Sequence, residues 1–186
     1  KNNMNEQKNL RSISHKEILA MFISSLVIGF IINFRPWYKT GKVELTFFII
    51  SFAATVLASF AIILIRSWAQ KFIALKLGYI TTYTVHKYSL PISIFIMFFT
   101  NGLLPFVSPG ELKIKESKRL RLGSFRYGLN QQDLSIIALA APVSTILLMI
   151  IIKPIFLVTS NILVDRIIQS AAAITFFGMI PIACQE

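Results

Sequence analysis

Leu45 to Ile65 contains no charged residue, and this run constrains the chain more than any other feature of its sequence. About 20 consecutive apolar residues are what an α-helix needs to cross the hydrocarbon core of a bilayer. The composition agrees, because 55% of the 186 residues are apolar and only 15% are charged, against about 25% charged in a soluble domain. The sequence therefore predicts an all-α polytopic membrane protein whose first partner is the lipid bilayer.

The first apolar stretch, Ile18 to Phe34, has signals for both of its ends. Ser14 and Glu17 have the spacing of a capping box, in which the two residues satisfy backbone N–H groups at a helix start. Arg35-Pro36 follows the stretch with a charge and a helix-breaking residue. We therefore expect the first span to end there. Residues 1–43 form an N-terminal arm and first helix, and residues 44–186 form the core.

Three further helices are expected in the core. The helix of residues 44–77 continues past Ile65 in a helical pattern, and Gly78 is typical of the residue that follows a helix end. The other two are expected at residues 134–158 and at residues 167–186. Lys153-Pro154, near the end of the first of these, is interpreted as a helix-end signal at the interface. The chain is thus expected to span the bilayer four times.

The region between the second and third spans is more irregular. Residues 79–86 are rich in β-branched and aromatic side chains, which predicts a strand. Residues 88–107 are uncharged and long enough to span, but Pro91, Asn101-Gly102 and Pro105 interrupt them, so this element either re-enters or spans. Residues 108–133 are expected to form a basic cytoplasmic loop.

The net charge of +11 is interpreted as a topology signal. Basic loops stay in the cytoplasm, and most basic residues fall on one side of the membrane only if residues 88–107 re-enter. This arrangement predicts a cytoplasmic N-terminus in the cell membrane. A nucleic-acid partner is not expected, since the charges lie between apolar spans. The loop is a solvated segment or a contact for anionic lipid or an acidic partner, through Lys113, Lys115, Lys118, Arg119, Arg121 and Arg126.

Several segments resemble the site-2 protease family of intramembrane zinc metalloproteases, in its archaeal-type branch. Ile65 to Tyr79 resembles the zinc-binding helix of the family, which reads H-E-x-x-H and then an apolar residue, Ala and Gly. Ser108-Pro109-Gly110 is similar to a turn of that branch, and Ala140-Ala141-Pro142 looks like the A-G-P-x-x-N motif that opens the next core helix. Phe177 to Glu186 is similar to the N-x-x-P…L-D-G segment, which supplies the third zinc ligand. The resemblance implies a site-2-protease-like transmembrane core with a small membrane-associated β element.

The chain departs from the family where the chemistry is carried out. Two His one helical turn apart can hold Zn²⁺ while a neighbouring Glu polarises its water, but the matching positions here are Arg66, Gln70 and Ser67. Arg cannot lose its proton to become a ligand, and a Ser hydroxyl is no general base at neutral pH. Glu186 falls at the position of the third ligand. One carboxylate without two imidazoles makes no catalytic site, so no cofactor is expected.

Other residues offer little to rebuild a metal site. His15 precedes the first helix, His86 follows the strand, and Cys184 lies two residues from Glu186. A metal needs clustered donors, so these residues are interpreted as interfacial or packing residues. Arg66 either reaches the interface with its charge or forms an intramembrane ion pair with Glu186.

The predicted strand offers a second binding surface. In active relatives it lies where substrate adds as an extra strand, so Tyr79, Thr81, Tyr83 and Val85 either receive a partner by strand addition or pair only within their own sheet.

These observations predict a catalytically inactive pseudoprotease. Its expected role is an accessory or scaffolding subunit of a membrane complex, or a binder of client helices. The alternative is an active zinc metalloprotease whose site is completed by His86 and Glu186 or by a partner. A channel or transporter is less favoured, because the apolar runs lack interior ionisable residues.

Overall fold

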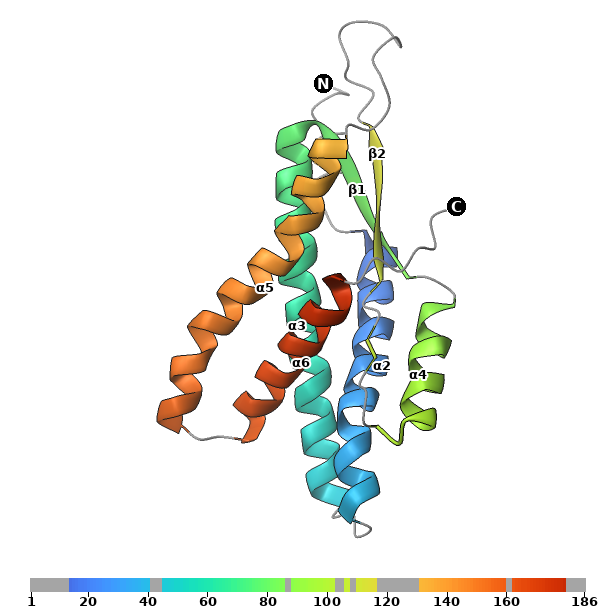
Figure 1. Cartoon of the computed structure of the whole chain (residues 1–186), viewed down its shortest axis with the longest axis vertical. Helices are drawn as coiled ribbons and strands as arrows, with labels where there is room; N and C mark the ends of the chain where they lie inside the picture. Colours follow the sequence, from blue (N-terminus) through green and yellow to red (C-terminus); the bar gives the residue numbers. More distant parts are fainter. Residues whose placement is uncertain are drawn as a thin grey trace, which may run out of the picture.

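The computed structural model describes residues 14–40, 45–85, 88–102, 106–107, 110–116, 131–159 and 162–179. This part of the chain contains five helices and one two-stranded antiparallel sheet (Figure 1). Helices α2, α3 and α5 are long and apolar enough to cross a membrane by length and composition. The structure thus confirms a mostly helical protein with candidate membrane spans and a small sheet.

Helix α2 (His15–Thr40) lies alongside helix α3 (Leu45–Leu77) over much of its length (Figure 1). The candidate span His15–Phe34 ends where expected, before Arg35-Pro36, but helix α2 itself continues to Thr40. A proline removes a single N–H group, and membrane helices tolerate that loss. Helix α3 ends as expected: Gly78 adopts a φ of +87°, which favours glycine, and its N–H reaches the Leu75 carbonyl at 3.3 Å.

The sheet consists of β1 (Tyr79–Thr84) and β2 (Glu111–Glu116) in antiparallel pairing. Strand β1 agrees with the strand predicted at residues 79–86, although Val85 lies just outside it. Strand β2 corrects the prediction of a loop over residues 108–133. Leu112 and Ile114 are half-buried and alternate with exposed Lys113. This alternation gives the strand one apolar face, although the segment has a charged composition.

Helix α4 (Ser89–Phe99) occupies the segment between the two strands. Its 11 residues extend only about 16 Å, half of the roughly 30 Å hydrocarbon core. Thr84, the last residue of β1, is paired with Glu111, the first residue of β2, so the intervening chain returns to the level it left (Figure 1). Whether residues 88–107 re-enter or span the bilayer stays a prediction.

Helices α5 (Gln131–Thr159) and α6 (Ile162–Met179) complete the fold. Both begin earlier than predicted. Pro142 does not open α5, and Lys153-Pro154 does not end it, because both prolines lie inside the helix. The fourth expected span, at residues 167–186, is described only in part, and Ile167–Met179 is a shorter apolar helix segment. Residues 180–186 lie outside the described residues.

The protein core lies where α2, α3 and α6 meet. Ile28 and Ile31 of α2, Ile62 of α3 and Ile174 of α6 are almost completely buried. Large apolar side chains also cover the outer surface, including Leu57 and Phe99 at 68% and 82% exposure. This arrangement suits a protein whose outer helix faces contact lipid.

Candidate functional site

The three positions that match the H-E-x-x-H motif line one cavity. Arg66, Ser67 and Gln70 lie on consecutive turns of α3 and border a cavity of about 250 Å³. Residues three and four apart lie on one face of a helix, which explains why they share a wall. Side chains of the sheet, of α5 and of α6 close the cavity; they include Tyr83, Leu112, Ile114, Leu134, Ile137 and Gly178.

Arg66 ties α3 to the last turns of α6. Its Nη1 donates a hydrogen bond to the Ile174 carbonyl at 2.9 Å, and its Nη2 donates to the Gly178 carbonyl at 3.5 Å. Carbonyls at a helix C-terminus carry the negative end of the helix dipole, so they suit a cation. Arg66 therefore bonds to backbone of a neighbouring helix and does not extend away from the bundle. Its expected pairing with Glu186 lies outside the described residues and stays a prediction.

Gly178 makes room for the guanidinium of Arg66. A methyl group on Gly178 would lie 2.7 Å from Nη1 and 2.8 Å from Cζ of Arg66, and closer still to Nη2. These distances are below normal van der Waals contact, so any other residue at position 178 would displace the guanidinium. The absence of a side chain at Gly178 thus lets the Arg66 guanidinium approach the backbone of α6.

Gln70 and Ser67 have different surroundings within the cavity. The Gln70 side-chain amide donates to the Ile137 carbonyl of α5 at 3.4 Å, so Gln70 connects α3 with α5 as Arg66 connects it with α6. Ser67 is only 2% exposed and lines the cavity. The cavity wall therefore combines a cation, an amide and a hydroxyl.

Tyr83 closes the cavity from the sheet side. It is 6% exposed, and its hydroxyl donates to the Ser24 hydroxyl of α2 at 3.3 Å. Burial raises the pKa of Tyr83 to about 12, while the hydrogen bond with Ser24 and the charge of Arg66 act in the opposite direction. The phenol is therefore neutral at physiological pH and serves as a hydrogen-bonding wall residue.

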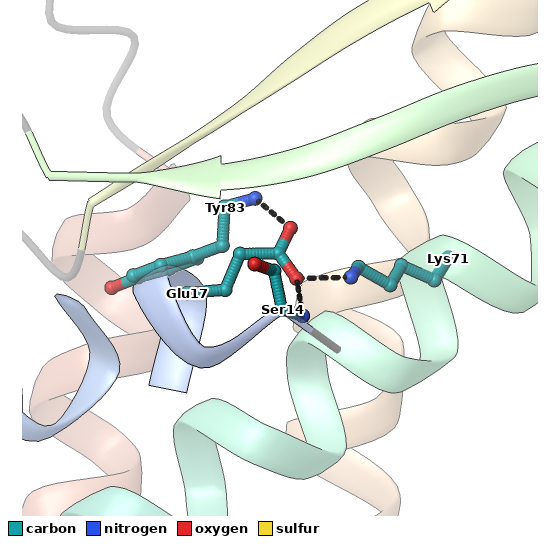
Figure 2. A network of polar contacts seen from close by, with 4 residues as sticks. All are labelled: Ser14, Glu17, Lys71 and Tyr83. Atoms are coloured by element: carbon teal, nitrogen blue, oxygen red, sulfur yellow. Dashed lines mark hydrogen bonds and ion pairs between the residues drawn. The ribbon is translucent and has the colours of Figure 1, made fainter. Parts of the chain in front are cut away.

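A buried ion pair lies next to the cavity and holds three elements together (Figure 2). Lys71 of α3 and Glu17 of α2 approach to 2.6 Å, with side chains only 8% and 7% exposed. Glu17 also accepts hydrogen bonds from the backbone N–H of Ser14 at 3.0 Å and of Tyr83 at 2.9 Å. The Glu17 half of the predicted capping box is thus present, and the same carboxylate fixes β1.

The hydrogen bond to Glu17 also bears on strand addition. The Tyr83 N–H points away from β2 to reach Glu17, so the outward edge of β1 is occupied at this residue. Tyr79 and Asp133 form a further contact at 3.1 Å, and Thr81 is buried. Receipt of a partner strand by Tyr79, Thr81, Tyr83 and Val85 remains a prediction, and in this conformation it would have to displace Glu17.

Sequence reasoning missed the Glu17–Lys71 pair. The sequence predicts Glu17 only as part of a helix cap and indicates no partner for Lys71. The available signal was that each charge adjoins a long apolar run, where charged residues usually find partners. The partner itself could not be identified, because the two residues are 54 positions apart.

The remaining predicted residues are only partly placed. His15 is exposed at the start of α2, and Lys113 is exposed on β2. Lys115 is paired through its backbone with Ile80. The other predicted residues lie outside the described part of the chain: His86, Lys118, Arg119, Arg121, Arg126, Cys184 and Glu186.

Two further findings concern metal binding and similarity to known proteins. Within the described ranges, no three His, Cys, Asp or Glu side chains gather into a group that could hold a metal ion. No protein-family model, curated protein or solved structure matches the chain. The site-2 protease resemblance therefore remains a hypothesis carried by the residues themselves.

Proposed function

We propose that this chain is a non-catalytic membrane protein with a site-2-protease-like core, which binds partner subunits or client helices without cutting them. One observation carries the proposal. Arg66 and Gln70, which occupy the positions of the two metal-binding His, donate hydrogen bonds to the backbones of α6 and α5. Cross-helix bonds take the structural place that a metal would have, and Ser67 offers no general base between them.

The surroundings of the cavity support a binding role. The cavity of about 250 Å³ is too small for a helix, so a client would contact the outer faces. Trp68 follows Ser67 directly, is 65% exposed and stacks on Phe72. Exposed aromatic side chains of this kind bury large areas in membrane-protein contacts. In this proposal the N-terminus lies on the cytoplasmic side of the cell membrane, because basic residues favour that side.

Zinc content tests the negative half of the proposal. The full chain, purified in maltoside detergent, is expected to hold far less than one zinc per molecule and to leave a membrane-segment peptide uncut. The matched control is the triple variant Arg66→His, Ser67→Glu, Gln70→His, which restores two His on one helix face. A gain of zinc in that variant would show that the assay detects a site at this place. About one chelatable zinc per wild-type chain would overturn the proposal and favour the metalloprotease alternative.

Photo-crosslinking in native membranes tests the positive half. A photoreactive residue at Trp68 is expected to crosslink to a discrete membrane protein. The control position is Leu57 on the same helix, which is 68% exposed and lies away from the motif. Crosslinks to lipid alone at both positions would reject the binding role.

A further inference from the structure

The cavity beside Arg66 carries a positive charge that no carboxylate offsets among the described residues. The cavity is lined by one cation, Arg66, and the side chains around it include neither Asp nor Glu. The acceptors of Arg66 are two backbone carbonyls, which are dipoles without net charge. A guanidinium has five N–H donors, so these two bonds leave donors over. A charge in an apolar site without a counter-ion is costly, which favours an anion in the cavity.

Ser67 adds a second hydrogen-bonding group to the same wall. Its residue is 2% exposed and borders the cavity beside Arg66. A serine hydroxyl can donate one hydrogen bond. One acceptor placed in the cavity could take bonds from this hydroxyl and from the remaining donors of Arg66. An oxyanion provides several acceptor lone pairs on one small group.

The rest of the wall is apolar. Ile63, Leu112, Ile114 and Ile137 supply it from α3, β2 and α5. A volume of about 250 Å³ is that of roughly eight water-sized groups, which fits a head group and the first methylenes of a chain. Neither a free inorganic ion nor a purely apolar molecule would contact both the polar and the apolar parts of this wall favourably.

We propose that the cavity binds the oxyanionic head group of a single-chain amphiphile, a carboxylate or a phosphate, with Arg66 as the charged donor and Ser67 as the neutral one. A fatty acid and a lysophospholipid share this chemistry. The inference goes beyond the proposed function, because it assigns a small ligand to a cavity that no partner helix could enter.

Titration of the delipidated full chain in maltoside detergent tests the inference. The probes are oleate, oleoyl lysophosphatidate and neutral oleyl alcohol. At least one anionic probe is expected to bind ten-fold or more tightly than the alcohol, since bonds to charged groups are the stronger class. Preference for oleate identifies a fatty-acid site, and preference for the lysophosphatidate identifies a phospholipid-type site. Equal affinity for the alcohol would overturn the inference.

Variants decide whether the cavity itself is responsible. Arg66→Gln is expected to abolish the preference for anions, whereas Lys76→Gln, an exposed cation on the same helix, should leave it unchanged. Ser67→Ala should weaken anion binding several-fold, and Ala138→Phe should block the cavity from α5; both keep the bonds of Arg66 to α6 and carry the test if Arg66→Gln fails to fold. Unchanged binding in Ser67→Ala and Ala138→Phe would contradict the inference.

The chain's own Glu186 is the competing occupant. If wild type binds no anionic probe but Glu186→Gln does, the ion pair of Arg66 and Glu186 fills the cavity and the ligand proposal is rejected. Zinc analysis of the same samples keeps the two proposals separate, because metal content tests catalysis and anion preference tests the cavity.

Discussion

Arg66 and Lys71 lie on neighbouring turns of α3, but their charged groups bind different kinds of partner. Lys71 is 6% exposed and meets the Glu17 carboxylate at 2.6 Å. Arg66 borders a cavity, and its hydrogen bonds go to the carbonyls of Ile174 and Gly178. Lys71 has a carboxylate counter-ion inside the fold, whereas Arg66 is held by backbone carbonyls and has no carboxylate partner among the described residues.

This difference separates a structural charge from an available one. A buried ion pair is poor evidence of added stability, but removal of one partner leaves a charge without compensation. A guanidinium held by carbonyls keeps donors free and needs no carboxylate to stay oriented. Four measurements test this distinction.

The largest effect is expected from loss of the Glu17 carboxylate. Glu17→Gln would leave Lys71 buried without a counter-ion and weaken the bonds to Ser14 and Tyr83, at a cost of about 3–5 kcal/mol. Reversible unfolding in mixed maltoside and dodecyl sulfate micelles measures this cost. The control is the double variant Glu17→Gln, Lys71→Met, which removes the stranded charge and should recover most of the loss. An unchanged free energy of unfolding in Glu17→Gln would show that the pair is not structural.

Tyr83 lines the cavity beside Arg66, and its backbone N–H donates to Glu17 of the ion pair. Its phenol is expected to make the stability of the protein depend on pH. Its pKa is raised from the ordinary value of 10.0 to about 12, so the folded state keeps the phenolic proton that the unfolded state releases first. The resulting stabilisation is fully present below pH 10 and is lost as the pH rises from about 10 to 12, amounting to about 3 kcal/mol. Unfolding free energies measured between pH 9 and 12 should fall more steeply for wild type than for Tyr83→Phe. Parallel curves would contradict burial of the phenol.

Gly178→Ala tests how tightly Arg66 is held. The added methyl group would displace the guanidinium from the two carbonyls, with an expected loss of about 1–3 kcal/mol. In an Arg66→Met background the same change should cost nothing, because there is no guanidinium to displace. A double-mutant cycle of unfolding free energies measures this coupling. Equal costs in both backgrounds would mean that position 178 matters for another reason.

The smallest effect is expected where no charge is involved. The Thr175 hydroxyl of α6 lies 2.8 Å from the Thr145 hydroxyl of α5 and 2.6 Å from the Ala171 carbonyl of its own helix, within hydrogen-bond distance of both. Thr175→Val keeps the shape and removes the bond between the helices, which in membrane proteins is worth about 0.6 kcal/mol on average. Unfolding under the same conditions should barely change. A loss as large as that of Glu17→Gln would show that charge is not what distinguishes the two cations on α3.

Parts of the fold that depend on local pattern could be predicted from the sequence. Helix α3 was expected to its last residue, because an uncharged run and Gly78 define it without reference to the rest of the molecule. Proline was a poor guide, since Pro36, Pro142 and Pro154 all lie within helices. In a bundle, neighbouring helices and local adjustments compensate the missing N–H, and the sequence does not state which neighbours are present.

Only the α3 side of the candidate site could be predicted from the sequence. The helical spacing of Arg66, Ser67 and Gln70 placed them on one face, and the cavity confirms that they lie together. Their acceptors are the backbone carbonyls of Ile174, Gly178 and Ile137. Every residue has a carbonyl, so no residue type marks these partners. Strand β2 was missed for a related reason, because its pairing with β1 outweighs the charged composition of its segment.

The position of Glu17 in the chain has a consequence for biosynthesis. It precedes Lys71 by 54 residues and Tyr83 by 66, so a ribosome finishes Glu17 long before either partner exists. At 5–20 residues per second this interval lasts roughly 3–13 s. During that time the start of α2 must stay hydrated at the membrane surface, because an unpaired carboxylate cannot enter an apolar site cheaply. The contacts that Glu17 makes from α2 can therefore be completed only after α3 and β1 have been translated.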